Sequence, residues 1–233
     1  MKTLTLVKTL TFGLFIAGTA SSMLAMDKAE LDYRIHTLIA KFEAMQAKPD
    51  KAIPAENLRR AHGVILLERV KAGFIFAYQG GAGVALVKEP QTEQWSPAAF
   101  LTANEGSLGF QVGGQHSFVV ILLMNTNATR LLTEPSFEFG GEASGTAGNS
   151  SAGAEGTIAS VERPVLVYDD RKGLYGGAAI KAGALAPDAE ANRIYYGEFV
   201  TMQDILFDRK VKPTEAASKL AETLTRGAKV AQK

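Results

Sequence analysis

Residues 61–88 read AHGVILLERVKAGFIFAYQGGAGVALVK, and this stretch decides the fold class. Apolar, β-branched and aromatic runs at 64–67 and 74–78 flank a basic stretch that we expect to be a turn. A Gly-Gly-Ala-Gly sequence at 80–83 follows, which we expect to form a second turn before the run that ends at Val87. Within a sheet, glycine marks bulges, bends or the close approach of another backbone. The stretch predicts a bent sheet and indicates a binding module rather than an enzyme.

The rest of the chain extends this pattern and adds helices. Further strand-like segments lie at 84–87, 108–112 and 118–124, and their close spacing predicts an antiparallel meander or a curved, barrel-like or sandwich-like sheet. The small-residue segment 140–156 predicts tightly packed strands, with a flexible linker as the alternative. Helical patterns occupy 125–133, 187–207 and 214–231, the last with a thin apolar stripe that predicts weak packing. We therefore predict an α+β fold, a bent antiparallel Gly-rich sheet with flanking N- and C-terminal helices.

The first residues have the pattern of a secretory signal peptide. A basic start precedes an apolar stretch that is too short to cross a bilayer of roughly 30 Å, and small residues follow. We expect residues 1–25 to be a leader, and the protein to be periplasmic or secreted and peripherally membrane-associated. The chain has 233 residues and no cysteine, so disulfides and thiol chemistry are excluded. Without its leader the chain is almost neutral, which argues against nucleic acid as a partner.

An amphipathic helix is predicted directly after this leader. Apolar residues recur at spacings of three and four between 28 and 46, and the sequence Lys48-Pro49-Asp50 ends the pattern. The apolar stripe either packs on the body of the domain, or enters a membrane interface or docks a partner. The sequence leaves both uses open. The stripe consists of Leu31, Ile35, Leu38, Ile39, Phe42 and Met45.

Patterns that carry catalysis are missing from the sequence. No serine has glycine on both sides as in a nucleophile elbow, and His36, His62 and His116 lack metal-ligand spacing. The paired carboxylates of Asp169 and Asp170 precede Arg-Lys-Gly, which predicts a solvated hairpin turn. We expect no catalytic residue, no metal site, no cofactor and no enzymatic activity.

An ordered series of sequence blocks resembles the SYLF domain, the Ysc84-like family. The likeness covers about residues 55–207, and such a series is more specific than any single block. The blocks are Ala61-x-Gly63-Val64-Ile65, Val70-Lys71-Ala72-Gly73-Phe74, Gly80-Gly81-x-Gly83-Val84, Trp95-Ser96-Pro97-Ala98, Gly113-Gly114-Gln115, Lys172-Gly173-Leu174-Tyr175-Gly176-Gly177 and Asn192-x-x-Tyr195-Tyr196-Gly197.

The resemblance implies a lipid-binding module of the phosphoinositide or anionic-phospholipid type, in an exported bacterial member of the family. Some eukaryotic members bind actin, but we expect no actin binding from an exported chain that lacks an SH3 domain. The expected divisions are a leader (1–25), an N-terminal amphipathic helix and linker (26–54), the SYLF-like domain (55–207) and a C-terminal helix (208–233). The oligomeric state stays open.

Lipid binding requires an apolar element for the interface and cations for the headgroup phosphates. The apolar candidates are the stripe residues Leu31, Ile35, Leu38, Ile39 and Phe42, and the cationic candidates are Arg59, Arg60, Arg69 and Lys71. Arginine suits phosphate because its planar fork donates two hydrogen bonds at once. A solvated basic turn is the alternative for the cations. The alternative function is a structural or partner-docking envelope protein that uses the N-terminal helix.

Overall fold

The computed structural model describes residues 26–72, 77–107, 115–139, 145–147, 150–152, 165–170, 173–174 and 184–229. The predicted leader and the predicted strand at 108–112 lie outside these residues, as does most of the predicted strand segment 140–156. The statements below concern the described residues.

A ten-stranded sheet forms the centre of the molecule, and every neighbouring pair of strands is antiparallel. Its order is β7-β6-β5-β10-β3-β2-β1-β4-β8-β9, and the described residues give no pairing between the edge strands β7 and β9. The sheet is thus open rather than a closed barrel. The strands are β1 (Gly63–Ala72), β2 (Ala77–Val87), β3 (Ala99–Ser107), β4 (Gln115–Leu123), β5 (Phe137–Phe139), β6 (Gly145–Ala147), β7 (Ser150–Ala152), β8 (Val165–Asp169), β9 (Gly173–Leu174) and β10 (Ala184–Pro187).

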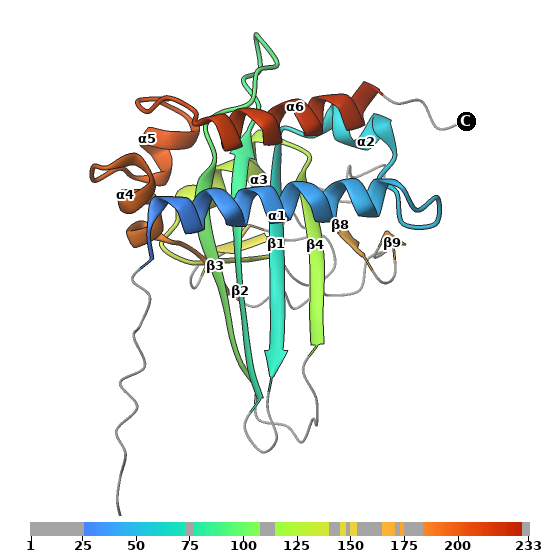
Figure 1. The fold of residues 1–233 in the computed structure, drawn as a ribbon, viewed down its shortest axis with the longest axis horizontal. Coiled ribbons are helices and arrows are strands. Elements are labelled where there is room, and N and C mark those ends of the chain that lie inside the picture. The colour runs from blue at the N-terminus through green and yellow to red at the C-terminus, as the bar shows by residue number, and fades with distance from the viewer. Residues whose placement is uncertain are drawn as a thin grey trace, which may run out of the picture.

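Helices cover both faces of this sheet. Figure 1 shows α1 and α6 side by side across the strands, α4 and α5 near the start of α1, and α2 near the C-terminal end of α6. The helices are α1 (Lys28–Gln46), α2 (Ala55–Arg60), α3 (Thr126–Arg130) with the 3-10 turn η1 (Leu131–Thr133), α4 (Ala189–Tyr196), α5 (Met202–Leu206) and α6 (Glu215–Lys229).

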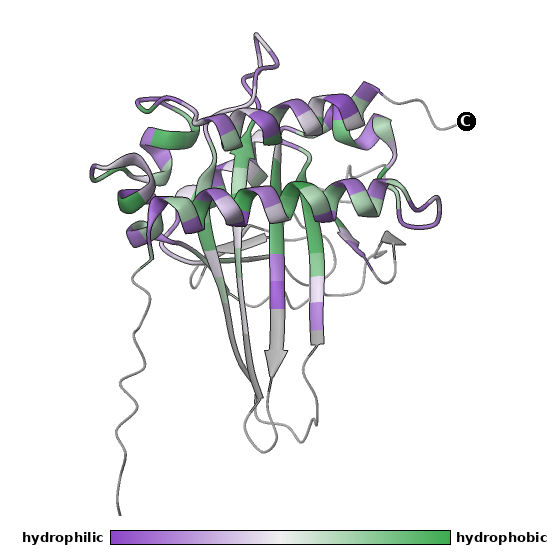
Figure 2. Cartoon of the chain, in the orientation of Figure 1, coloured by the Kyte–Doolittle hydropathy of each residue, from purple (hydrophilic) through white to green (hydrophobic). Residues whose placement is uncertain are grey.

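The central strand β1 divides the core into two clusters. Side chains alternate along a strand, so Val64 and Leu66 face α1 and α6, whereas Ile65 and Leu67 face α3 and α5 on the other side. All four side chains are fully buried. Figure 2 shows the corresponding pattern, with apolar residues where strands pass under the helices and polar residues where β1 continues past α1. The sheet is therefore buried on both faces only along part of its length.

The opening stretch is less interrupted than the sequence predicted. The predicted basic turn lies inside β1, and the predicted glycine turn at 80–83 lies inside β2; both predictions were wrong. The polar residue Glu68 marks the point where β1 leaves the core, and its carboxylate pairs with the Lys41 ammonium of α1 at 3.2 Å. A Cβ on Gly83 would lie 2.1 Å from the carbonyl oxygen of Leu66. That glycine marks a close backbone approach, as expected for glycine within a sheet.

The predicted α+β fold, an antiparallel sheet with flanking helices, is confirmed by the structure. The helix predicted at 125–133 is present as α3 and η1, and Asn125 caps α3 by accepting a hydrogen bond from the Ala128 amide. The prediction of weak packing for α6 was wrong, because Leu220 and Leu224 are fully buried against α1, α2 and the sheet. None of the helices in the described ranges is long and apolar enough to cross a membrane.

Candidate binding surface

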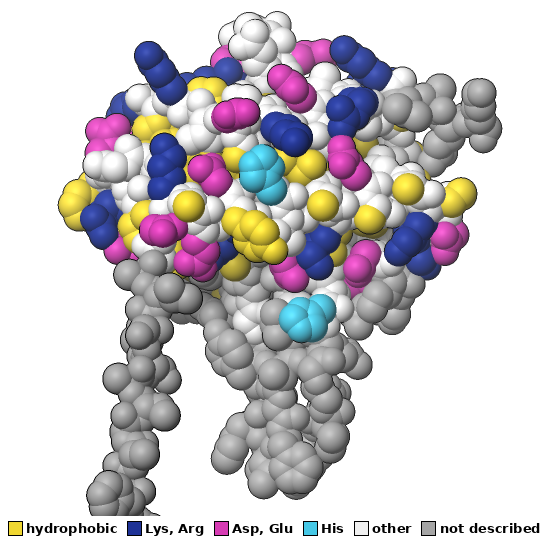
Figure 3. Space-filling view, in the orientation of Figure 1, with side chains coloured by type: hydrophobic (Ala, Val, Ile, Leu, Met, Phe, Trp, Pro, Cys, Tyr) yellow, Lys and Arg dark blue, Asp and Glu magenta, His cyan; other side chains and the backbone are white. Residues whose placement is uncertain are grey.

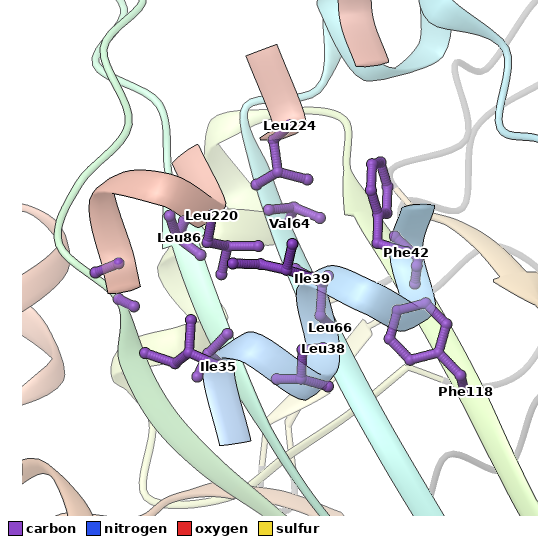
Figure 4. Close-up of a cluster of buried hydrophobic side chains, with 14 of the residues drawn as sticks. Ile35, Leu38, Ile39, Phe42, Val64, Leu66, Leu86, Phe118, Leu220 and Leu224 are labelled. Atoms are coloured by element: carbon purple, nitrogen blue, oxygen red, sulfur yellow. The ribbon is translucent and has the colours of Figure 1, made fainter. Parts of the chain in front are cut away.

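The apolar stripe of α1 faces the sheet and belongs to the core. Leu31, Ile35 and Leu38 are completely buried, and Ile39 and Phe42 are no more than 4% exposed. Figure 4 shows Ile35, Leu38, Ile39 and Phe42 in one cluster with Val64, Leu66, Leu86 and Phe118 of the sheet and Leu220 and Leu224 of α6, and Leu31 belongs to the same cluster. The packing alternative therefore holds. In this structure the stripe is not available as a membrane element or as a docking face for a partner.

The cationic candidates do not form one cluster. Arg59 and Arg60 are exposed at the C-terminal end of α2, which precedes β1. Arg69 lies six positions along β1 from Gly63, which corresponds to roughly 20 Å of strand. The side chain of Lys71 lies outside the described part. Separation along an extended strand divides cations that are close in sequence.

Arg59 instead contacts residues from distant parts of the chain. The Arg59 guanidinium donates a hydrogen bond to the Ala228 carbonyl of α6 at 3.4 Å, and the Lys88 ammonium donates one to the Arg59 carbonyl at 2.8 Å. These contacts join the ends of α2, β2 and α6, and Figure 3 shows basic side chains over the C-terminal part of α6. We call this surface the basic corner; it consists of Arg59, Arg60, Lys88, Arg226 and Lys229.

A groove of about 800 Å³ lies next to the basic corner, between α6 and the loop that joins β2 to β3. The half-buried Trp95 forms part of the loop wall, and the small residues Ala217, Ser218 and Ala221 form the helix wall. Arg226 and Lys229 belong to both surfaces. We call this feature the α6 groove. Sequence reasoning missed it, although Trp95 and the small residues of α6 are visible signals.

The loop wall of the α6 groove is held in an unusual backbone conformation. Among the described non-glycine residues, positive φ angles occur at Glu93 (56°) and Arg209 (52°). Glu93 lies in this loop, and Arg209 contacts the loop from the segment after α5. The Arg209 guanidinium donates a hydrogen bond to the Gln94 carbonyl at 2.7 Å and pairs with the Glu89 carboxylate at 3.4 Å. Such conformations persist where surrounding contacts fix them, and they concentrate at functional sites.

Lys88 connects the α6 groove to the basic corner. Its ammonium lies 4.9 Å from the centre of the Trp95 ring, and it caps the C-terminal end of α2 by donating a hydrogen bond to the Arg59 carbonyl. Partial burial lowers the pKa of Lys88, while the nearby Glu93 carboxylate acts in the opposite direction. A cation over an indole face is a stabilising arrangement, and here it also fixes the orientation of the ring.

The buried polar groups of the described core stabilise the fold. The Tyr195 hydroxyl donates to Asp32 of α1 at 2.7 Å and hydrogen-bonds the Thr214 hydroxyl before α6. The Tyr196 hydroxyl donates to the Ala98 carbonyl at 2.6 Å. Burial raises the pKa of both tyrosines far above its usual value, so each stays a neutral donor.

The histidines and the paired aspartates do not form a metal site in the described part of the chain. The exposed His36, His62 and His116 belong to separate elements. The Asp170 carboxylate accepts a hydrogen bond from the Phe118 amide at 3.1 Å, so it has a structural role at the edge of the sheet.

Comparisons with known proteins match this sequence to one family. Residues 104–227 match the family model Ysc84, described as "Las17-binding protein actin regulator". This chain belongs to the Ysc84 family. SH3 domain-containing YSC84-like protein 1 is 32% identical over 171 residues in Xenopus laevis and 30% identical over 170 residues in Homo sapiens; each alignment covers 72% of this chain. LAS seventeen-binding protein 3 of Saccharomyces cerevisiae is 31% identical over 195 residues, 79% of this chain.

This chain spans only about half of these relatives, or 51%, 49% and 42% of their respective lengths. No solved structure matches it. The family is one of binding proteins, as the sequence resemblance implied. The expectation that excluded actin was wrong as a statement about partners, because the matching family model is described as an actin regulator.

Proposed function

We propose that this member of the Ysc84 family is a non-enzymatic module that binds the anionic phospholipid surface of a membrane through the basic corner. The observation that supports this function is the convergence of Arg59 and Arg60 with Arg226 and Lys229 at the joined C-terminal ends of α2 and α6. These four side chains belong to two segments that are distant in sequence, and they are exposed.

The energetics of the basic corner suit a reversible interaction. Each lysine or arginine near an anionic membrane contributes about 1 kcal/mol, so a few cations give measurable but salt-sensitive binding. Arg226 pairs with the Glu43 carboxylate of α1 at 2.6 Å, and both side chains are at least half exposed. An exposed ion pair contributes roughly 0–1 kcal/mol, so a lipid phosphate can replace the carboxylate. Cations at helix C-termini also complement the helix dipole, which is the purely structural alternative.

Co-sedimentation with vesicles tests the proposal. The full chain is incubated with vesicles of phosphatidylcholine alone and with vesicles containing phosphatidylserine, at low and at high salt. We compare the double variant Arg59→Glu/Arg60→Glu with the matched control Lys212→Glu/Lys219→Glu, which changes exposed lysines outside the basic corner by the same charge.

We expect binding to phosphatidylserine vesicles that weakens with salt and falls at least about tenfold in the corner variant, since each lost cation corresponds to about 1 kcal/mol. The control variant should retain most of the binding. Equal losses in the two variants, or no binding to either vesicle, would contradict a role for the basic corner.

A second candidate is direct binding to actin filaments. It is favoured by the description of the matching family model as an actin regulator. Co-sedimentation with purified actin filaments tests it in the same format. Pelleting that requires filaments supports this candidate, and a chain that stays in the supernatant at every filament concentration excludes direct filament binding.

We further propose, from the leader-like residues 1–25, that the membrane in question belongs to the cell envelope. Fractionation of cells that express the full chain tests this location. Recovery of a shortened chain in the periplasmic fraction supports export, and a full-length chain confined to the cytosol contradicts it.

A further inference from the structure

We propose that the α6 groove binds an extended peptide segment of a partner protein, with an apolar side chain against Trp95 and carboxylates at Arg226 and Lys229. This site goes beyond the proposed lipid binding: it shares Arg226 and Lys229 with the basic corner, but the proposal does not require that lipid binds there. The proposal rests on the shape of the groove, on its fixed wall and on its charge.

The shape of the groove suits an extended chain. Its helix wall runs from Pro213, just before α6, to Lys229, a distance of roughly 24 Å at the rise of an α-helix. About seven residues of extended peptide have the same length. Because Ala217, Ser218 and Ala221 are small, they leave room for the backbone of a second chain beside the helix.

The opposite wall is held in place before any ligand arrives. Trp95 is fixed by the Lys88 ammonium, and the adjacent Ser96 hydroxyl accepts a hydrogen bond from the Val87 amide at 3.0 Å. The Arg209 contacts and the positive φ of Glu93 fix the loop itself. A wall that is already ordered lowers the entropic cost of binding. Aromatic walls are also the usual surface for prolyl and other apolar side chains of extended peptides.

The charges along the groove define a direction for the ligand. Arg226 and Lys229 lie at the C-terminal end of α6, where the Arg59 guanidinium at the Ala228 carbonyl adds further positive charge. Glu222 lies about two turns before Lys229, and Glu93 lies on the loop beside Trp95. Carboxylates of a peptide are therefore favoured at the Lys229 end, whereas beside Trp95 the Glu93 carboxylate and the Lys88 ammonium oppose each other.

Trp95 is the single tryptophan of the chain, so it reports directly on the groove. The probe is a synthetic peptide of about ten residues, labelled with fluorescein, that carries prolines and a leucine followed by three glutamates. Binding is measured by the anisotropy of the label and by the emission of Trp95. A second peptide replaces the glutamates with lysines.

The variants separate the groove from the rest of α6. Ser218→Leu fills the groove, and Lys219→Leu places the same side chain at the next position, on a part of the helix that does not line the groove. Arg226→Glu/Lys229→Glu reverses the charge at the basic end. Circular dichroism and urea unfolding confirm that each variant is folded before it is compared.

We expect the acidic peptide to shift Trp95 emission and to bind at least about tenfold more tightly than the lysine peptide, an energy difference of about 1.4 kcal/mol. Ser218→Leu should weaken this binding about tenfold or more, Lys219→Leu should leave it within about twofold, and the charge-reversed variant should prefer the lysine peptide.

Other occupants of the groove would overturn the proposal. One such result is a soluble short-chain phosphatidylserine that shifts Trp95 emission while the peptide does not. Another is concentration-dependent self-association in sedimentation velocity that Ser218→Leu abolishes and the peptide does not compete. A peptide affinity that is equal in the filled and the control variant would likewise place binding elsewhere.

Discussion

Helices α1 and α6 lie side by side on the same face of the sheet, but they use their surfaces in different ways. α1 buries six large apolar residues between Leu31 and Met45, whereas α6 buries small residues together with Leu220 and Leu224. The large stripe of α1 is saturated by its contacts with the sheet. The small side chains of α6 let it lie close to its neighbours and leave the α6 groove along its other side. Both stripes belong to the core, but the helix with the thinner stripe, α6, also borders an accessible groove, whereas the stripe of α1 is entirely covered.

The largest expected effect tests the assignment of the α1 stripe to the core. Phe42→Ala should lower the free energy of unfolding by about 3–5 kcal/mol, because it leaves a cavity among side chains that are already packed. Tyr33→Ala, on the same helix at a position 72% exposed, should change it by less than about 0.5 kcal/mol. Urea unfolding measures both. Similar values for the two variants would mean that the stripe is not core.

A smaller effect is expected where α6 approaches its neighbours. A Cβ on Gly227 would lie 3.2 Å from Leu58 Cδ1 and 3.4 Å from Phe42 Cε1, which is tight but can be relieved by side-chain movement. Gly227→Ala should be nearly neutral, because a gain of up to about 1 kcal/mol in helix propensity offsets this contact. Gly227→Leu should destabilise by about 1–3 kcal/mol through overpacking. Thermal unfolding of the pair measures how closely α6 is packed.

A weaker effect is expected for the ion pair that joins the two helices. Glu43→Gln should change stability by no more than about 1 kcal/mol, because the pair with Arg226 is exposed on both sides. The same variant frees the Arg226 guanidinium and should strengthen binding to phosphatidylserine vesicles. The control is Glu56→Gln on α2, which removes the same charge from an exposed carboxylate that does not pair with Arg226. Unchanged vesicle binding in both variants would show that Arg226 does not contact lipid.

The smallest expected effect concerns the Lys88 ammonium over Trp95. Burial lowers the pKa of Lys88 below its usual 10.5, so Trp95 emission should titrate with a midpoint below 10.5, and Lys88→Met should remove the transition. Between the folded and unfolded pKa values the unfolded state binds more protons, so this group makes stability rise with pH in that window. Fluorescence titration of the wild type and the variant measures the effect. An identical transition in Lys88→Met would assign it to another group.

Much of the fold followed from local sequence pattern. The spacing of Leu31, Ile35 and Leu38 predicted α1 and its apolar face, and the pattern at 125–133 predicted α3 together with η1. The failures had nonlocal causes. The strand β3 escaped prediction because the second half of its sequence, AFLTANEGS, lacks the apolar character by which the other strands were recognised. The glycine-rich sequence at 80–83 was interpreted as a turn. Gly83 is needed instead because the Leu66 backbone approaches it closely, and that approach results from the pairing of β1 with β2, which local sequence does not reveal.

The candidate surface was less predictable than the fold. The sequence singled out Arg59 and Arg60 as cationic candidates, but their neighbours in the basic corner, Arg226 and Lys229, lie more than 160 positions away in the chain. The sequence instead grouped them with Arg69, from which an extended strand separates them. Proximity in sequence is a good guide within a helix, where neighbouring turns stack, and a poor one across a strand.

Lys88 gives the two binding surfaces a shared component. Its ammonium simultaneously contacts the ring of Trp95 in the α6 groove and the Arg59 carbonyl in the basic corner. A ligand that displaces Trp95 must therefore also disturb the end of α2, and a ligand that draws on the basic corner must alter the cation over the indole. Thermodynamic linkage makes such an influence reciprocal, so occupancy of either surface should change the affinity of the other by the same factor.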